Sequence, residues 1–175
     1  MPGSPAHLFA RFFDVATAQR LTPSERATVS AWLTASTREV FFSQDDADQR
    51  HGHHAAQSVL ASGVEEREVI MAALLHDVGK RHARLGLIGR TVASLMILFH
   101  LPLPERMAIY RDHGAVAARE LGALGVPSLV IDFALHHHGS RPPTIEPTVW
   151  DVLVAADQPP KASARLRARI TSDAT

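Results

Sequence analysis

Apolar residues recur every three or four positions along almost the whole chain. This spacing gathers them on one face of an α helix, whereas a half-buried strand would alternate apolar and polar residues. No stretch of the sequence shows a sustained alternation. The pattern therefore predicts an all-α protein that forms a single domain of packed helices.

Helix caps, prolines and glycines divide this pattern into separate helices. For example, Thr22-Pro23-Ser24-Glu25 offers a cap, an early proline and an acidic first turn, and Pro142-Pro143 marks a loop that a helix cannot enter. We expect helices at residues 5–20, 23–37, 65–78, 105–124, 127–138 and 147–157. A further helix should follow the polar residues 43–48 and end at Gly63, another should follow the loop 86–89 and end near Leu101, and a surface helix should form within 161–175.

The most apolar window is TVASLMILFHLPL, residues 91–103. It is shorter than the run of about 20 apolar residues that a membrane-spanning helix needs. We expect a helix buried in the core. The alternatives are an interfacial helix and a helix through which the protein would form an oligomer.

Length indicates a single domain, and charge argues against a protein that binds a nucleic-acid polymer. A chain of 175 residues is the size of one domain with a continuous core. Lys plus Arg and Asp plus Glu both number 18, so the chain lacks the overall positive field that holds a nucleic-acid polymer. The N-terminal sequence MPGSPAHLFARFF has no secretory pattern, and we expect a cytoplasmic protein without a membrane or nucleic-acid partner.

The chain contains eleven histidines and no cysteine. A metal site would therefore use His, Asp and Glu, which suit a divalent ion such as Mn, Fe, Zn, Co, Ni or Mg. The histidines are dispersed through apolar helical segments, with no tag-like run at either end. Their number alone also fits a helical scaffold whose histidines are structural.

The segment LLHDVGK ends a hydrophobic run on the adjacent residues His76 and Asp77. An imidazole nitrogen and a carboxylate oxygen side by side can bind one divalent metal from two directions. His51 lies on the core-facing stripe of the preceding helix, whereas His53 and His54 point elsewhere. Antiparallel packing of the two helices would bring His51 close to the His76-Asp77 pair.

Asp157 ends the apolar segment VLVAAD. Taken alone, such a carboxylate is explained by helix capping or by exposure, because burying it unpaired would be costly. Together with His51, His76 and Asp77 it completes a site of two histidines and two aspartates.

His113 and the run His136 to His138 offer a second set of nitrogens. Histidines at a helix C-terminus are also favourable simply because imidazolium suits the negative end of the helix dipole. Successive helical residues point about 100° apart, so the three cannot all bind one metal, although two could flank it.

The succession of His51, His76-Asp77 within LLHDVGK, and Asp157 within AAD resembles the HD superfamily of metal-dependent phosphohydrolases. The resemblance covers roughly residues 48–158, and HDVGK inside a hydrophobic helix is its specific motif. It implies a helical bundle of the HD-domain type. The expected parts are N-terminal helices at 1–45 packed on the core, a metal-binding domain at 46–160 and a tail at 161–175.

The resemblance also implies roles for the residues. The first metal would be bound by His51, His76, Asp77 and Asp157. The stretch YRDHGAVAARELGALG is similar to the H-x-x-x-G region of the two-metal branch, which would put His113 on a second metal. FALHHHGS is similar to the paired histidines of that branch, most naturally His137 and His138, with His136 as the alternative.

The loop GSRPPTI differs from the GYP-containing loop of the branch that degrades cyclic dinucleotides, and this argues against that substrate. A site with one metal, in which the other histidines contact phosphate or water, stays open. The resemblance implies hydrolysis of a small phosphorylated substrate, such as a nucleotide, a phosphate monoester or a phosphodiester, through a metal-activated water.

Within that function Asp77 would bind metal and orient the water, and Lys80 would neutralise phosphate charge, with Arg81, His82 and Arg84 forming a positive rim. Plain solvation is the alternative for Lys80. Two other functions remain open: a regulatory domain that binds nucleotide with little or no turnover, and a di-iron oxygenase like that of a related branch.

Overall fold

The computed structural model describes residues 19–158. In this part of the chain the backbone is helical and contains no β strand, which confirms the prediction of an all-α single domain. The helices are α2 (Pro23–Trp32), α3 (Ala35–Phe42), α4 (Asp46–Ala61), α5 (Arg67–Leu75), the 3-10 helix η1 (Val78–Ala83), α6 (Leu87–Leu98), α7 (Glu105–Arg111), α8 (His113–Ala123), α9 (Ser128–His136) and α10 (Pro147–Asp157). The helix expected at 5–20 falls almost entirely outside the described residues, and the one expected within 161–175 falls wholly outside them.

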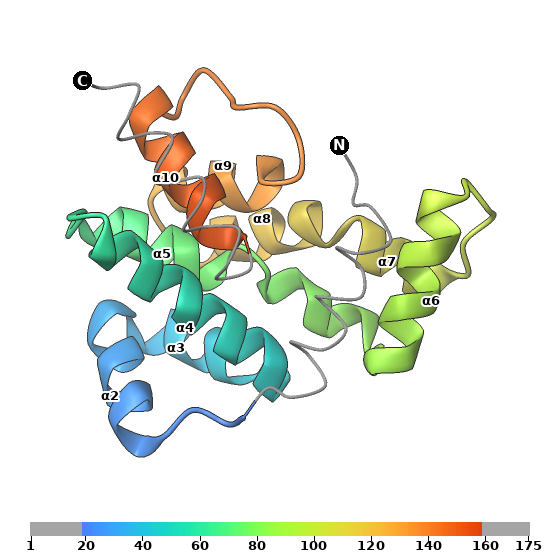
Figure 1. Ribbon diagram of the computed structural model, residues 1–175, viewed down its shortest axis with the longest axis horizontal. Coiled ribbons are helices and arrows are strands. Elements are labelled where there is room, and N and C mark those ends of the chain that lie inside the picture. The colour runs from blue at the N-terminus through green and yellow to red at the C-terminus, as the bar shows by residue number, and fades with distance from the viewer. Residues whose placement is uncertain (1–18, 159–175) are drawn as a thin grey trace.

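Helix α5 forms the centre of the bundle, with α4, α9 and α10 packed around it (Figure 1). Its sequence is apolar on every side from Val69 to Leu75, and all of these residues are buried. A helix that is apolar all round is stable only when neighbours cover it. Each large apolar side chain buried in this way contributes about 1.5–3 kcal/mol of hydrophobic stabilisation. The polar residues that follow Leu75 therefore emerge inside the protein.

The helix expected at 23–37 is in fact two helices. Leu33 is extended, and Thr34 caps α3 by accepting a hydrogen bond from the backbone N–H of Thr37, whose hydroxyl in turn accepts one from the N–H of Thr34. This reciprocal cap stabilises the start of a second helix within a segment whose apolar residues keep a continuous helical spacing. The spacing alone did not reveal it.

Two further helix boundaries differ from the prediction near the histidines. The helix expected at 105–124 breaks at Asp112, so that His113 begins a new helix, α8. The helix expected at 65–78 ends at Leu75, and His76 and Asp77 form a turn before η1. Both breaks place candidate ligands at helix ends, where side chains from different helices can converge.

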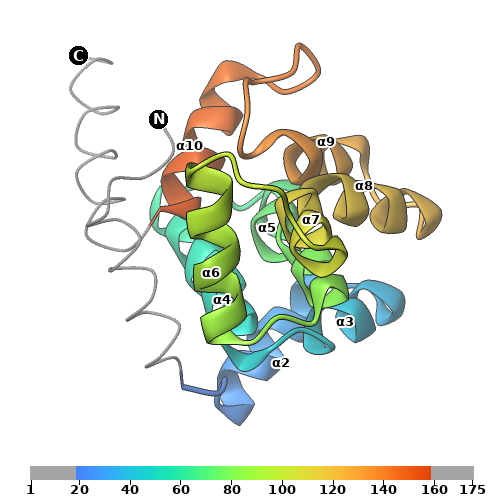
Figure 2. The ribbon, with the colours of Figure 1, turned by 90° about the vertical axis from the view of Figure 1, so that its right-hand side faces the viewer.

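The expectation of a buried core helix at 91–103 is wrong. Within this window only Ala93 is buried, while Phe99 and Leu101 are 67% and 50% exposed. Helix α6 begins at Leu87, inside the expected loop 86–89, and extends to one side of the bundle together with α7 (Figures 1 and 2). Apolar content did not reveal that so few of the residues in 19–158 cover this helix. Its participation in an oligomer stays a prediction.

Across the described ranges, none of the helices has both the length and the apolar character needed to cross a membrane.

Candidate metal centre

Seven side chains from five parts of the fold meet at the buried end of α5. They are His51 on α4, His76 and Asp77 in the turn after α5, His113 at the start of α8, His137 and His138 after α9, and Asp157 at the end of α10. Each was predicted as a metal ligand, and the structure brings all of them together. His53, His54 and His136 belong to neither of the two groups described below.

Two glycines allow the backbones around this point to touch. A Cβ atom on Gly79 would lie 2.0 Å from the carbonyl oxygen of His113, and one on Gly114 would lie 2.7 Å from the carbonyl oxygen of Ala134. Both distances are shorter than non-bonded atoms tolerate. Glycine at these positions therefore lets η1, α8 and α9 approach closely enough for their histidines to share one space.

The first group consists of His51, His76, Asp77 and Asp157. Oδ1 of Asp157 lies 2.9 Å from Nε2 of His51 and 3.1 Å from Nε2 of His76. Oδ2 of Asp77 lies 3.6 Å and 3.5 Å from the same two nitrogens. Two imidazole nitrogens and two carboxylate oxygens thus surround one point, which is a donor set suited to a divalent ion.

The second group consists of Asp77, His113, His137 and His138. Oδ1 of Asp77 lies 3.1 Å from Nε2 of His113 and 3.5 Å from Nε2 of His137. Nε2 of His113 lies 3.3 Å from Nε2 of His137 and 3.2 Å from Nε2 of His138. Asp77 therefore belongs to both groups, with one carboxylate oxygen directed at each.

Backbone carbonyls fix the protonation of three of these rings. Nδ1 of His76 lies 3.0 Å from the carbonyl oxygen of residue 73. Nδ1 of His113 lies 2.7 Å from the carbonyl oxygen of residue 110, and Nδ1 of His137 lies 2.8 Å from that of residue 134. A carbonyl oxygen only accepts, so each Nδ1 carries the proton and donates it. In the neutral ring Nε2 then presents a lone pair, which is the arrangement typical of metal-binding histidines.

This tautomer leaves His113 and His137 without a proton to donate at the centre of the second group. The lone pairs of His113 and His137 face each other and Asp77 Oδ1, a buried oxygen with no hydrogen-bond partner among the described residues. Acceptors this close repel one another unless a positive charge lies between them. The residues present therefore fit a cation.

The charge states of the group support the same interpretation. Burial opposes ionisation of Asp77, but the positive charge of Lys80 outweighs it and holds the pKa of Asp77 well below the usual range. Burial likewise opposes ionisation of Asp157, and contacts from His51 and His76 hold its pKa well below the usual range. Both carboxylates are anionic at neutral pH, as metal ligands must be.

Two histidines of the second group, His113 and His138, remain neutral at neutral pH. Desolvation lowers the pKa of His113. Desolvation and the neighbouring rings of His137 and His113 lower the pKa of His138 to about 3. Neutral imidazole is the form that binds metal.

The basic residues after Asp77 differ in their surroundings. Lys80 is 4% exposed and its Nζ donates to Oδ2 of Asp77, so the alternative of plain solvation is wrong. Arg81 and His82 both contact the carboxylate of Glu120. Lys80 is thus the only one of these three whose charge lies against Asp77.

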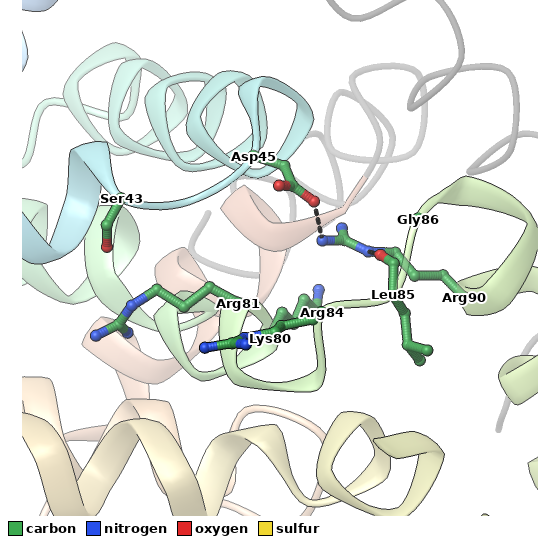
Figure 3. Close-up of a pocket in the computed structure, with 8 residues that line it drawn as sticks. All are labelled: Ser43, Asp45, Lys80, Arg81, Arg84, Leu85, Gly86 and Arg90. Atoms are coloured by element: carbon green, nitrogen blue, oxygen red, sulfur yellow. Dashed lines mark hydrogen bonds and ion pairs between the residues drawn. The ribbon is translucent and has the colours of Figure 1, made fainter.

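Beside Lys80 lies a pocket of about 320 Å³ between η1 and the start of α4 (Figure 3). Sequence reasoning missed part of its wall, including the buried Arg90, which binds both carboxylate oxygens of Asp48 at 2.7 and 2.8 Å. The sequence did offer a signal for this ion pair, because an arginine lies inside an apolar helix and an aspartate lies on α4. The signal could be interpreted only with the knowledge that α4 and α6 are neighbours.

Comparison with known proteins gives a family match. The family model of the HD domain matches residues 49–174, a range that contains both groups of candidate ligands. Neither the curated proteins nor the solved structures provide a significant match.

Proposed function

The chain belongs to the HD-domain family, and on that basis we propose that it is a metal-dependent phosphohydrolase acting on a small phosphorylated molecule. The observation that carries the proposal is the position of Asp77, whose two carboxylate oxygens face two separate groups of histidines. A carboxylate shared in this way suits two divalent ions held close together. Such pairs of ions stabilise both the attacking and the leaving oxygen in phosphoryl transfer.

In this proposal His51, His76, Asp157 and Oδ2 of Asp77 hold one ion. His113, His137, His138 and Oδ1 of Asp77 hold the second. When bound, divalent ions supply Lewis acidity, which polarises a phosphoryl oxygen and lowers the pKa of water. The backbone carbonyls behind His76, His113 and His137 keep their Nε2 atoms directed at the centre, so that the site is organised before substrate binds.

The low pKa of Asp77 decides which task this residue performs. A strongly acidic carboxyl group is a poor proton acceptor near neutral pH, because a general base works best when its pKa is close to the operating pH. Asp77 therefore acts as a ligand and as a hydrogen-bond acceptor that orients water. It does not act as the general base that accepts a proton from water.

Lys80 carries a positive charge next to Oδ2 of Asp77 and lines the neighbouring pocket. We assign it to the substrate side of the centre, where its ammonium group neutralises charge on a phosphoryl oxygen. In the reaction the oxygen of water bonds to phosphorus and the ester P–O bond breaks. The proton released by water ends on the leaving oxygen.

The test uses full-length, untagged protein whose metal content is measured by elemental analysis, and a panel of phosphate monoesters, nucleotides and phosphodiesters. We expect metal-dependent release of phosphate or alcohol, and a loss of at least about 100-fold in Asp77→Ala. Asp151→Ala is the matched control, because Asp151 is an exposed aspartate outside both groups.

Two outcomes would contradict the proposal. Metal-loaded protein that binds nucleotide tightly without forming product would identify a regulatory binding domain. Protein that retains no divalent metal would identify a scaffold with structural histidines.

A further inference from the structure

We propose that the pocket beside the metal centre binds a second phosphate group of the substrate, with Arg84 as its main ligand. This inference rests on the proposed phosphohydrolase function and narrows it to substrates that carry two phosphate groups. One phosphate would react at the centre around Asp77, and the other would be held in the pocket.

Cations make up half of the residues that line the pocket. Its wall consists of Ser43, Asp45, Lys80, Arg81, Arg84, Leu85, Gly86 and Arg90. In Figure 3, Lys80, Arg81 and Arg84 extend below the start of α4, and Asp45 is joined to Arg90. Four positive side chains thus face a space of about 320 Å³ that has one carboxylate in its wall. This volume lies at the lower end of the range for small-molecule sites.

Three of the four cations already have anionic partners. Arg90 binds Asp48 and, at 2.8 Å, Asp45. Arg81 pairs with Glu120, and Lys80 pairs with Asp77. These ion pairs hold the three side chains in position and balance their charges, so the three are not free to follow a ligand.

Arg84 differs from the other three. Among the described residues its guanidinium group has no hydrogen-bond or ion-pair partner, and the residue is exposed at the pocket. A guanidinium group offers paired N–H donors that match the oxygens of a phosphate. Arg84 is therefore the cation whose pairing capacity is available to a ligand.

The backbone of Arg84 is held in an unusual conformation. Its φ of 49° and ψ of 43° lie in the left-handed region, which is unfavourable for a residue with a side chain. Arg106 donates to the carbonyl oxygens of Ala83 and Arg84, and the N–H of Arg84 donates to the carbonyl of Arg81. These bonds hold the turn, so that Arg84 stays at the pocket.

The start of α6 adds a positive partial charge beside Arg84. Gly86 is the N-cap of this helix and lines the pocket, and no side chain caps its first N–H groups. The positive end of the helix dipole therefore lies at the pocket. On its own this feature would not define a site, but it has the same sign as the four cations.

Lys80 links the pocket to the metal centre. It lines the pocket while its Nζ contacts Asp77, so a molecule in the pocket lies one lysine side chain away from the candidate metal ligands. A small molecule with phosphate groups at two positions, such as a nucleoside bisphosphate, can place one phosphate at the metal centre and the other in the pocket.

The binding test uses inorganic pyrophosphate and the full-length, metal-loaded protein. Calorimetry would compare wild type with Arg84→Gln, Arg84→Lys and the control Arg67→Gln, which removes an exposed arginine outside the pocket. We expect Arg84→Gln to raise Kd about 10-fold, because a charge-assisted contact is lost, and Arg84→Lys to recover part of the affinity. Arg67→Gln should match wild type. Equal Kd values for wild type and Arg84→Gln would overturn the proposal, provided that the melting temperatures show both proteins to be folded.

The kinetic test compares a nucleoside 3′,5′-bisphosphate with the matching 5′-monophosphate. We expect wild type to favour the bisphosphate in kcat/KM, and Arg84→Gln to reduce that preference about 10-fold. A wild-type preference of 1 would overturn the inference while the phosphohydrolase function stands. If no substrate is hydrolysed but pyrophosphate binding still depends on Arg84, the pocket stands and the proposed reaction fails.

Discussion

Nε2 of His113 lies 3.1 Å from Oδ1 of Asp77, a buried oxygen without a hydrogen-bond partner among the described residues. Because Nδ1 of His113 donates to a backbone carbonyl, neither atom supplies a proton to the other while the ring is neutral. This arrangement is favourable when a cation lies between them. It is the relationship from which the predictions about metal binding follow.

Neighbouring histidines at the end of α9 should differ in their effect on metal binding. His138 belongs to the second group of ligands and His136 does not. We expect His138→Ala to weaken binding of the second metal at least about 10-fold, a loss that is seen even for groups that only orient a ligand. His136→Ala should leave both sites unchanged. Calorimetric titration of each variant with Mn²⁺ measures the difference, and equal effects of the two substitutions would argue against the assignment.

Asp157 should couple metal binding to stability. Its carboxylate lies within 3.1 Å of Nε2 of both His51 and His76. A ligand present at 100 times its Kd stabilises a folded protein by about 2.7 kcal/mol. We expect wild type to show this metal-dependent rise in thermal stability and Asp157→Asn to lose most of it. Asp151→Asn, on the exposed side of the same helix, should retain the rise, and a rise that persists in Asp157→Asn would exclude Asp157 as a ligand.

Gly79 should not tolerate a methyl group. The added Cβ would lie 2.0 Å from the carbonyl oxygen of His113, so η1 and α8 would have to separate. Overpacking of this kind costs about 1–3 kcal/mol or more. Gly122→Ala is the control, because its Cβ would meet its nearest neighbour, Ile131, at 3.9 Å, and alanine is the better helix former by up to about 1 kcal/mol. Chemical denaturation should therefore show opposite signs for the two substitutions, and a neutral Gly79→Ala would contradict the close packing.

The ion pair between Glu25 and Arg50 should make stability fall in acid. Hydrogen bonds from Arg50 and from the backbone of Thr22 lower the pKa of Glu25 from 4.5 to about 2. A carboxyl group whose pKa is lower in the folded state stabilises the protein above its unfolded pKa. That stability is lost as the pH falls from about 4.5 to about 2. Glu25→Gln retains the capping geometry without the charge, so its melting temperature should fall less than that of wild type over this range. Parallel curves would contradict the role of the pair.

Local signals in the sequence were sufficient for the helices and for the candidate ligands. The three-to-four spacing predicted an all-α domain, and LLHDVGK drew attention to His76 and Asp77. The cap at Thr34 and the break at Asp112 escaped prediction because single hydrogen bonds, and not the apolar spacing, decide where those helices begin.

Other features depend on contacts between distant segments and could not be predicted from local pattern. The sequence did not indicate that the two oxygens of Asp77 face different histidine groups, since this depends on how η1 packs on α8. It also did not indicate the Arg90 pair with Asp48, which joins residues 42 positions apart. The exposed face of α6 escaped prediction for the same reason, because apolar sequence does not reveal which neighbours cover it.

The most direct test of the metal centre is anomalous X-ray diffraction from crystals of the full-length protein grown with Mn²⁺. The predicted result is one peak bound by His51, His76, Asp77 and Asp157, and a second on the other oxygen of Asp77 beside His113, His137 and His138. Crystals of protein that contains manganese by elemental analysis but shows no peak at Asp77 would contradict the proposed centre.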